Sequence, residues 1–184
     1  MLGGIICAWL CWAGAAGGAD LLTTKPHDVM ACYLGQFPAY VEWPTNTSVA
    51  AATPWRIGIL GSDPFGEVLE KVVQDRKVAG RSFEICRAAK LPDLPPCEII
   101  FIAGKDANEI KKILQQLGSQ PVLTVSDYDH FLALGGIIQL QTRDTVRMLI
   151  NLDAARSAKL KIRGTLLEVA SEATENGGRR ILRK

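Results

Sequence analysis

Hydrophobic residues occur along this chain as short continuous runs, separated by segments in which they recur every three or four positions. Four runs lie at residues 55–60, 82–87, 98–103 and 122–126. Runs of this length are typical of strands buried in a parallel sheet. Because helical segments separate the runs, the pattern predicts an α/β fold with a mainly parallel, Rossmann-like sheet flanked by helices.

The first helix is expected to begin at Thr24, whose side chain would cap it, with Pro26 in its first turn. Its apolar face has helical spacing and consists of Val29, Tyr33 and Phe37. Pro38 has no amide hydrogen and is therefore expected to end or kink this helix.

A second helix has clear signals at both ends and is predicted over residues 107–117. Asp106 is placed to cap it, and Glu109 completes a capping box with that residue. Gly118 is the expected stop, because glycine readily adopts the left-handed conformation that ends many helices.

Residues 57–66 read IGILGSDPFG, which places a glycine between a strand and a helix, where some proteins bind a phosphate. Here Asp63 would repel a phosphate, and Pro64 lacks an amide donor. The glycine spacings of dinucleotide and P-loop sites are also absent. The segment is therefore predicted to be a corner with a helix starting at Pro64.

The pattern changes in the last third of the chain. Residues 135–141 and 145–152 are two β runs separated by the short turn 142–144, which predicts a C-terminal antiparallel hairpin. Two further helices are expected over residues 153–159 and 165–175. The whole is predicted to be a single compact domain over residues 24–176, followed by a basic, flexible and solvated tail over residues 177–184.

The first nineteen residues carry no charge and contain a compact apolar stretch followed by small residues. This composition predicts a secretory signal peptide over residues 1–19 and an exported mature protein. A membrane-spanning helix is disfavoured because glycines dilute the apolar stretch.

Composition narrows the function classes. The chain has 184 residues, of which 48% are hydrophobic and 22% charged, and its formal net charge is +2. These values describe an ordinary globular domain and give no electrostatic reason to expect a nucleic-acid partner.

Export changes the meaning of the cysteines, because thiols tend to pair in an oxidising compartment. Cys86 and Cys97 are the candidate disulfide, since the ten residues between them form the shortest loop. Such a bond would stabilise the fold by about 2–3 kcal/mol in the chain-entropy picture. Cys32 is then left over, and the alternative is that all three are buried thiols.

Catalytic and metal sites have little support in the sequence, and neither they nor a cofactor is predicted. The two histidines, His27 and His130, are far apart and lack partners at metal-ligand spacing. Ser126, Asp127 and His130 are the residue types of a hydrolase triad, but one short turn rarely brings such groups together. Ser126 and Asp127 are instead expected to cap the short helix that follows.

Two places could bind a ligand or a partner. Arg147 and Asn151 would lie on one face of a strand, where they could hold an anionic or polar ligand, or where Arg147 could simply face solvent and pair with an acid. Tyr40 and Trp43, beside Pro44, could form a contact surface or lie at the edge of the core.

Several segments, taken together, resemble those of the YfiR-like family of periplasmic proteins. They are AYVEWP, IGILGSDPFG, GRSFEIC, CEIIFIAG, PVLTVSD, GGIIQLQ, VRMLINLDAARSAKLKI and LLEVA, in that order. The likeness covers about residues 28 to 171.

The resemblance implies a non-catalytic α/β domain in the periplasm, often dimeric, that inhibits a membrane-bound diguanylate cyclase. Such proteins bind the periplasmic domain of the cyclase and lower its cyclic di-GMP output. They are released by an outer-membrane lipoprotein or by redox stress, which would give Cys86 and Cys97 a role.

Two alternatives remain at this point. The chain could be a periplasmic sensor module for a histidine kinase or a transporter, with a small ligand at Arg147 and Asn151. It could also be a secreted hydrolase if Ser126, Asp127 and His130 converged.

Overall fold

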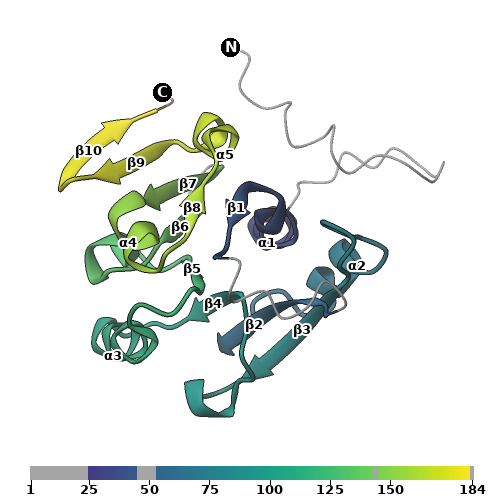
Figure 1. The fold of residues 1–184 in the computed structure, drawn as a ribbon. Coiled ribbons are helices and arrows are strands. Elements are labelled where there is room, and N and C mark those ends of the chain that lie inside the picture. Colours follow the sequence, from purple (N-terminus) through teal and green to yellow (C-terminus); the bar gives the residue numbers. More distant parts are fainter. Residues whose placement is uncertain (1–24, 45–52, 143–144, 183–184) are drawn as a thin grey trace.

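A computed structural model describes residues 25–44, 53–142 and 145–182. It shows an α/β domain built on an eight-stranded sheet with the order β10-β9-β7-β6-β5-β4-β2-β3 (Figure 1). The predicted signal peptide, the cap at Thr24 and residues 143–144 of the predicted turn lie outside the described residues.

The strands of this sheet are β2 (Trp55–Gly61), β3 (Phe83–Ala88), β4 (Ile99–Ala103), β5 (Leu123–Ser126), β6 (Ile138–Thr142), β7 (Val146–Asn151), β9 (Glu172–Glu175) and β10 (Gly178–Ile181). The short strands β1 (Val41–Glu42) and β8 (Lys161–Ile162) pair separately. Strands β3, β2, β4, β5 and β6 are parallel, whereas β6 and β7 form an antiparallel pair. The predicted parallel sheet and the antiparallel hairpin after it are therefore confirmed.

The helices are α1 (Pro26–Tyr40), α2 (Val68–Val73), α3 (Ala107–Leu117), α4 (Leu152–Ser157) and α5 (Gly164–Val169), with 3-10 turns η2 (Leu91–Asp93) and η3 (Phe131–Leu134). Helix α3 begins and ends where the sequence predicts. The Asp106 side chain accepts a hydrogen bond from the Glu109 amide at 2.8 Å, and Gly118 has a φ of 53°.

The sheet separates two apolar clusters. On one face, α1 and α2 bury residues such as Met30, Phe37 and Leu69 against the middle strands. On the other face, Ile110 of α3 and Phe131 of η3 pack over the opposite side of β4 and β5. The central strands are thus covered on both sides, which explains their continuous apolar sequences.

Helix α1 continues past Pro38 and ends at Tyr40. Both Phe37 and Pro38 are buried, so tertiary packing keeps these residues helical although one amide donor is missing. Immediately after the helix, the Tyr40 carbonyl accepts a hydrogen bond from the Arg163 amide at 2.9 Å, beside the β1–β8 pair.

The segment after β2 is a corner, as predicted, but its helix starts later than Pro64. Asp63 accepts a hydrogen bond from the Phe65 amide at 2.7 Å and an ion pair from Arg87 at 2.7 Å. These bonds favour a turn, so α2 begins only at Val68.

The predicted helix over residues 165–175 is wrong in its second half. Helix α5 ends at Val169, and Glu172–Glu175 form β9, which pairs in parallel with β7. Glu and Ala favour helices, but hydrogen bonding to the exposed edge of β7 overrides that local preference. The segment predicted to be a flexible tail contains β10, which pairs with β9 and is exposed.

One glycine is required by close packing on the face covered by η3. A Cβ atom at Gly136 would lie 2.1 Å from the Phe131 ring, and that ring is fully buried. We expect Gly136→Ala to lower the free energy of unfolding by about 1–3 kcal/mol, because a buried aromatic ring cannot move aside freely. Urea unfolding measures this change.

Gly164→Ala is the matched control, because a Cβ at Gly164 would meet nothing within 4 Å. This variant should be neutral or slightly stabilising. Equal stability of both variants would contradict the packing assigned to Gly136.

Candidate functional site

A groove of about 650 Å³ lies at the amino ends of β2, β4 and β5. Two tryptophans, six prolines and three leucines line it, together with charged residues that include Arg56, Arg81 and Glu98. The apolar lining residues used below are Trp43, Trp55, Leu94 and Cys97. The groove brings together the segment after β1, the starts of β2 and β4, and the η2 region.

Two tryptophans form one wall. The rings of Trp43 and Trp55 are 5.2 Å apart, tilted by 50°. Trp55 is 8% exposed, and its indole nitrogen donates to the Val78 carbonyl at 3.0 Å. Trp43 is half-buried, and its indole nitrogen has no hydrogen-bond partner within the described part of the chain. Large aromatic rings of this kind give contact area at low entropic cost.

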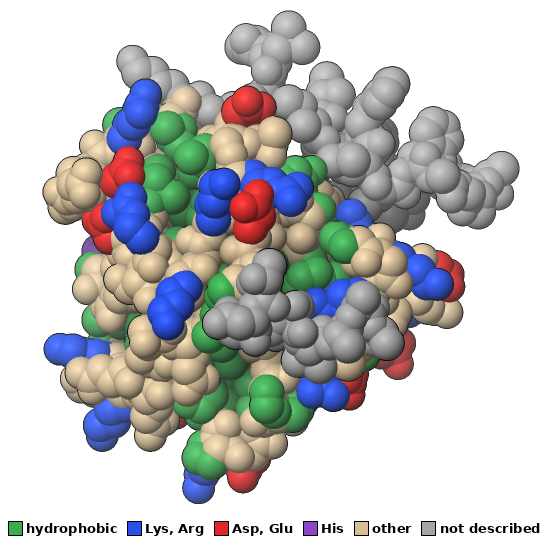
Figure 2. All heavy atoms as spheres, in the orientation of Figure 1, with side chains coloured by type: hydrophobic (Ala, Val, Ile, Leu, Met, Phe, Trp, Pro, Cys, Tyr) green, Lys and Arg blue, Asp and Glu red, His purple; other side chains and the backbone are tan. Residues whose placement is uncertain are grey.

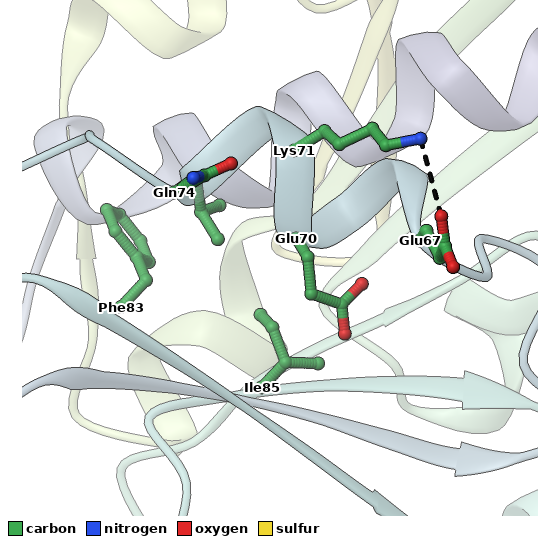
Figure 3. A pocket seen from close by; sticks show the side chains of 7 residues that line it. Glu67, Glu70, Lys71, Gln74, Phe83 and Ile85 are labelled. Atoms are coloured by element: carbon green, nitrogen blue, oxygen red, sulfur yellow. Dashed lines mark ion pairs between the residues drawn. The ribbon is translucent and has the colours of Figure 1, made fainter.

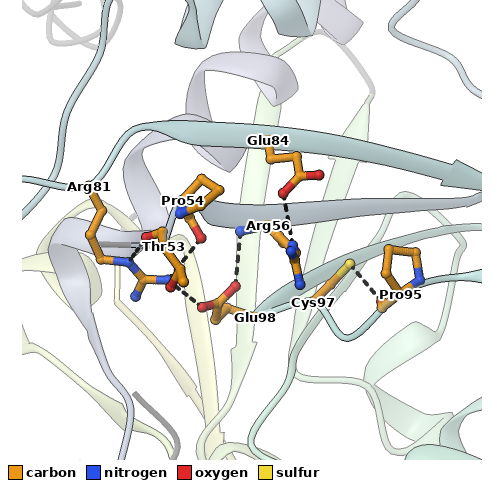
Figure 4. A network of polar contacts seen from close by, with 8 residues as sticks. All are labelled: Thr53, Pro54, Arg56, Arg81, Glu84, Pro95, Cys97 and Glu98. Carbon is orange, nitrogen blue, oxygen red and sulfur yellow. Dashed lines mark hydrogen bonds and ion pairs between the residues drawn. The ribbon is translucent and has the colours of Figure 1, made fainter. Parts of the chain in front are cut away.

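A partly buried ion pair joins Arg81 and Glu98 (Figure 4). The Arg81 guanidinium bonds a Glu98 carboxylate oxygen at 2.6 Å and donates to the carbonyls of Thr53 at 2.7 Å and Pro54 at 2.9 Å. It also lies 3.8 Å from the centre of the Trp55 ring. With these partners Arg81 is committed to the fold rather than exposed for an anionic ligand.

Glu98 is engaged on both oxygens. Its second oxygen accepts a hydrogen bond from the Arg56 backbone amide at 2.9 Å. Arg81, Glu98 and Arg56 therefore tie the starts of β2, β3 and β4 together and hold the groove wall in one conformation.

The sequence reasoning missed this network. Its only sequence signal is that charged residues stand beside strand starts, at Arg81 after a glycine and at Glu98 after Cys97. Such a signal does not say that the two side chains meet.

Cys86 and Cys97 lie near each other and no disulfide joins them, while the Cys97 thiol donates a hydrogen bond to the Pro95 carbonyl at 3.1 Å. Cys97 is buried and lines the groove, while Cys86 is half-buried on the edge strand β3. Burial raises the pKa of Cys97 to about 12. Burial also raises the pKa of Cys86, with a contribution from Glu84.

Gly58 makes room for this arrangement. It lies opposite Cys86 in the β2–β3 register, and a Cβ there would come 2.6 Å from the Leu94 side chain and 3.1 Å from the Cys97 sulfur. The loop that carries Cys97 can therefore lie directly on β2.

Of the four predicted binding residues, only one lines the groove. Trp43 lines it, whereas Tyr40 is half-buried at the end of α1 and does not. Arg147 is exposed on β7. The Asn151 side chain accepts from the Ala154 amide at 2.9 Å, capping α4, and donates to a carbonyl of η3 at 3.3 Å. Ligand binding by Arg147 and Asn151 stays a prediction.

The three residues considered as a hydrolase triad, Ser126, Asp127 and His130, have different surroundings in the structure. The Ser126 hydroxyl is buried, donates to the Ile102 carbonyl at 2.6 Å and accepts from the Tyr128 amide at 3.1 Å. Burial raises the pKa of Asp127, while His130 is exposed. The predicted capping of η3 by Ser126 and Asp127 is wrong, because no side chain caps that turn.

A second hollow, of about 450 Å³, lies between α2 and β3 (Figure 3). Phe83 and Ile85 form its floor, and Glu67, Glu70 and Lys71 its rim. The Arg87 guanidinium bonds Glu70 at 2.5 Å and thereby lowers the pKa of that carboxyl. The Glu70 charge at the rim of this hollow is thus already paired with a neighbouring residue.

Charge and metal chemistry add no further site. Figure 2 shows basic and acidic side chains interspersed on the face in view. Within the described residues, no group of His, Cys, Asp and Glu could hold a metal ion. No helix among the described residues is long and apolar enough to cross a membrane.

Comparison with known proteins identifies the family. No curated protein sequence matches this chain. A sequence model of the YfiR/HmsC-like family matches residues 27–171. This range includes the groove walled by Trp43 and Trp55 (the tryptophan groove), the thiol pair Cys86 and Cys97 (the dithiol) and the parallel strands β2–β6. That match spans most of the chain, and the family is regulatory rather than catalytic. The protein is therefore a member of the YfiR/HmsC-like family.

Proposed function

We propose that this protein is a periplasmic regulator that inhibits a membrane-bound diguanylate cyclase by binding the cyclase's periplasmic domain. Family membership over residues 27–171 is the observation that carries this proposal. The groove walled by Trp43 and Trp55 is the proposed contact surface.

The position of the groove favours a protein partner over a small ligand. In open parallel sheets, small ligands bind beyond the carboxyl ends of the strands. This groove lies at the amino ends, and its lining includes tryptophans, prolines and arginines. Interface centres are enriched in aromatic residues and arginine, and a fixed surface loses little entropy on binding.

The dithiol gives this surface a means of redox response. Cys97 lines the groove and neighbours Cys86, so a disulfide between them would pull the Cys97 loop toward the edge strand. Formation of the bond releases two protons and two electrons to an external thiol oxidant or disulfide. The proposed result is a shift in affinity for the cyclase domain.

The first test is Trp43→Ala. The full-length chain, expressed with the membrane-bound diguanylate cyclase encoded nearest to its gene, should lower cytoplasmic cyclic di-GMP. Loss of a central aromatic contact costs at least 2 kcal/mol, so Trp43→Ala should weaken binding to the purified periplasmic domain about thirtyfold or more. It should also abolish the inhibition.

Phe83→Ala is the matched control, because Phe83 is also half-buried but lines the hollow between α2 and β3. It should leave affinity unchanged. A folded Trp43→Ala chain that still inhibits the cyclase would contradict the groove assignment, and a wild-type chain that never binds the domain would contradict the function itself.

The second test uses the pH dependence of stability in the reduced protein. Because the folded pKa of Cys97 is raised to about 12, its stabilising effect is complete below the unfolded thiol pKa near 8.5. That effect should be lost progressively as pH rises from about 8.5 toward 12.

A Cys86–Cys97 disulfide removes the titrating thiols, so the oxidised chain should not show this loss. The measurement is the difference in unfolding free energy between oxidised and reduced protein at pH 7 and pH 10, in which lysine and tyrosine effects cancel. A difference independent of pH, or failure of the two cysteines to form the bond, would argue against the redox proposal.

A further inference from the structure

The β9–β10 hairpin lies outside the part of the chain that matches the family. The match ends at residue 171, and β9 begins at Glu172. The hairpin extends the sheet beyond β7, and β10 is the last strand on that side within the described residues (Figure 1). Its function therefore has to be inferred from its own residues.

The register shows which backbone groups face the open edge. The Leu182 amide donates to the Ser171 carbonyl at 3.0 Å, in line with the β9–β10 pairing. Because hydrogen-bonded pairs alternate along an antiparallel ladder, Arg180 is bonded inward to β9. The N–H and C=O groups of Arg179 and Ile181 therefore point away from β9.

The side chains of β10 are exposed along its whole length. Ile181 is 63% exposed and is the one large hydrophobic side chain that is exposed among the described residues. Arg179 bonds Glu172 of β9 at 2.6 Å, and Arg180 lies on the opposite face of the strand, by alternation. Within the described residues, the edge thus combines backbone groups that face away from β9, one apolar side chain and the positive charge of Arg180, whereas the charge of Arg179 is balanced by Glu172.

In two of the possible registers, pairing with a second copy of this chain would place like charges opposite each other. If two copies of β10 pair in antiparallel fashion about a two-fold axis at Arg179, each Arg179 lies opposite the Arg179 of the other copy. An axis at Arg180 likewise places the two Arg180 residues opposite each other. Like charges directly opposite each other destabilise a strand pair. An acidic strand would instead meet attraction at Arg180, while Arg179 is already paired with Glu172.

We propose that β10 is a docking strand for an extended acidic segment of a partner protein. The segment adds to the sheet as an antiparallel strand, bonding the outward groups of Arg179 and Ile181. Its two acidic residues lie opposite Arg179 and Arg180, and an apolar residue covers Ile181. This surface is separate from the tryptophan groove, so the proposal does not rest on cyclase inhibition.

The test uses the full-length protein and fluorescein-labelled peptides of sequence TTVEETT and TTVKKTT, followed by fluorescence polarisation. The central Val-Glu-Glu matches Ile181, Arg180 and Arg179 in antiparallel order. We expect the acidic peptide to bind and the lysine peptide not to bind.

Two matched pairs then locate the site. Arg180→Glu should weaken acidic-peptide binding about tenfold, because attraction becomes repulsion, whereas Lys77→Glu changes the charge equally at an exposed site elsewhere and should have no effect. Methylating the backbone nitrogen of the second Glu, which faces β10, should abolish binding. Methylating that of the first Glu, which faces away, should be tolerated.

Three results would overturn the proposal. Binding of neither peptide at millimolar concentration would mean that the arginines only protect the edge against aggregation. Equal binding of both peptides would remove the charge selectivity. Cross-linking of two Ile181→Cys chains at that cysteine would show that a second copy fills the edge.

Discussion

The burial of β2 and β4 on both faces is the constraint on which the rest of the structure depends. Water is excluded from the middle of the sheet, so polar groups at the strand starts need partners within the protein. Arg81 and Glu98 supply them, joined at 2.6 Å and bonded to the backbone of neighbouring segments. Removing one member of this pair should destabilise the fold, because the other charge would lose its partner in a partly buried place.

The same ion pair makes the groove a fixed surface. Arg81 lies on the ring of Trp55, and Trp55 in turn contacts Trp43. A wall whose side chains are already held in place loses little conformational entropy when a partner binds. The ion pair that stabilises the strand starts therefore also holds the aromatic wall in the position in which the proposed partner would contact it.

How much the sequence predicts depends on whether the deciding contacts are local. The strands at residues 55–60 and 98–103 and the helix with Asp106 and Gly118 carry their signals within themselves, and the structure confirms them. Strand β9 reads EATE, a composition that favours a helix, and only the edge of β7 makes it a strand. Arg81 and Glu98 are seventeen residues apart in the sequence and are brought together by the fold of the segment between them. No local sequence pattern therefore predicts this pair.

The two proposed surfaces divide along the boundary of the family match. The groove and the pair Cys86 and Cys97 lie within residues 27–171, the part of the chain that the family model matches. The hairpin follows that boundary directly and forms the edge of the sheet within the described residues, where Arg180 is exposed. Because it replaces the edge of β7 rather than covering the groove, it can add a partner without disturbing the first contact. A partner bound to β10, as proposed, would leave the core and its ion pair untouched.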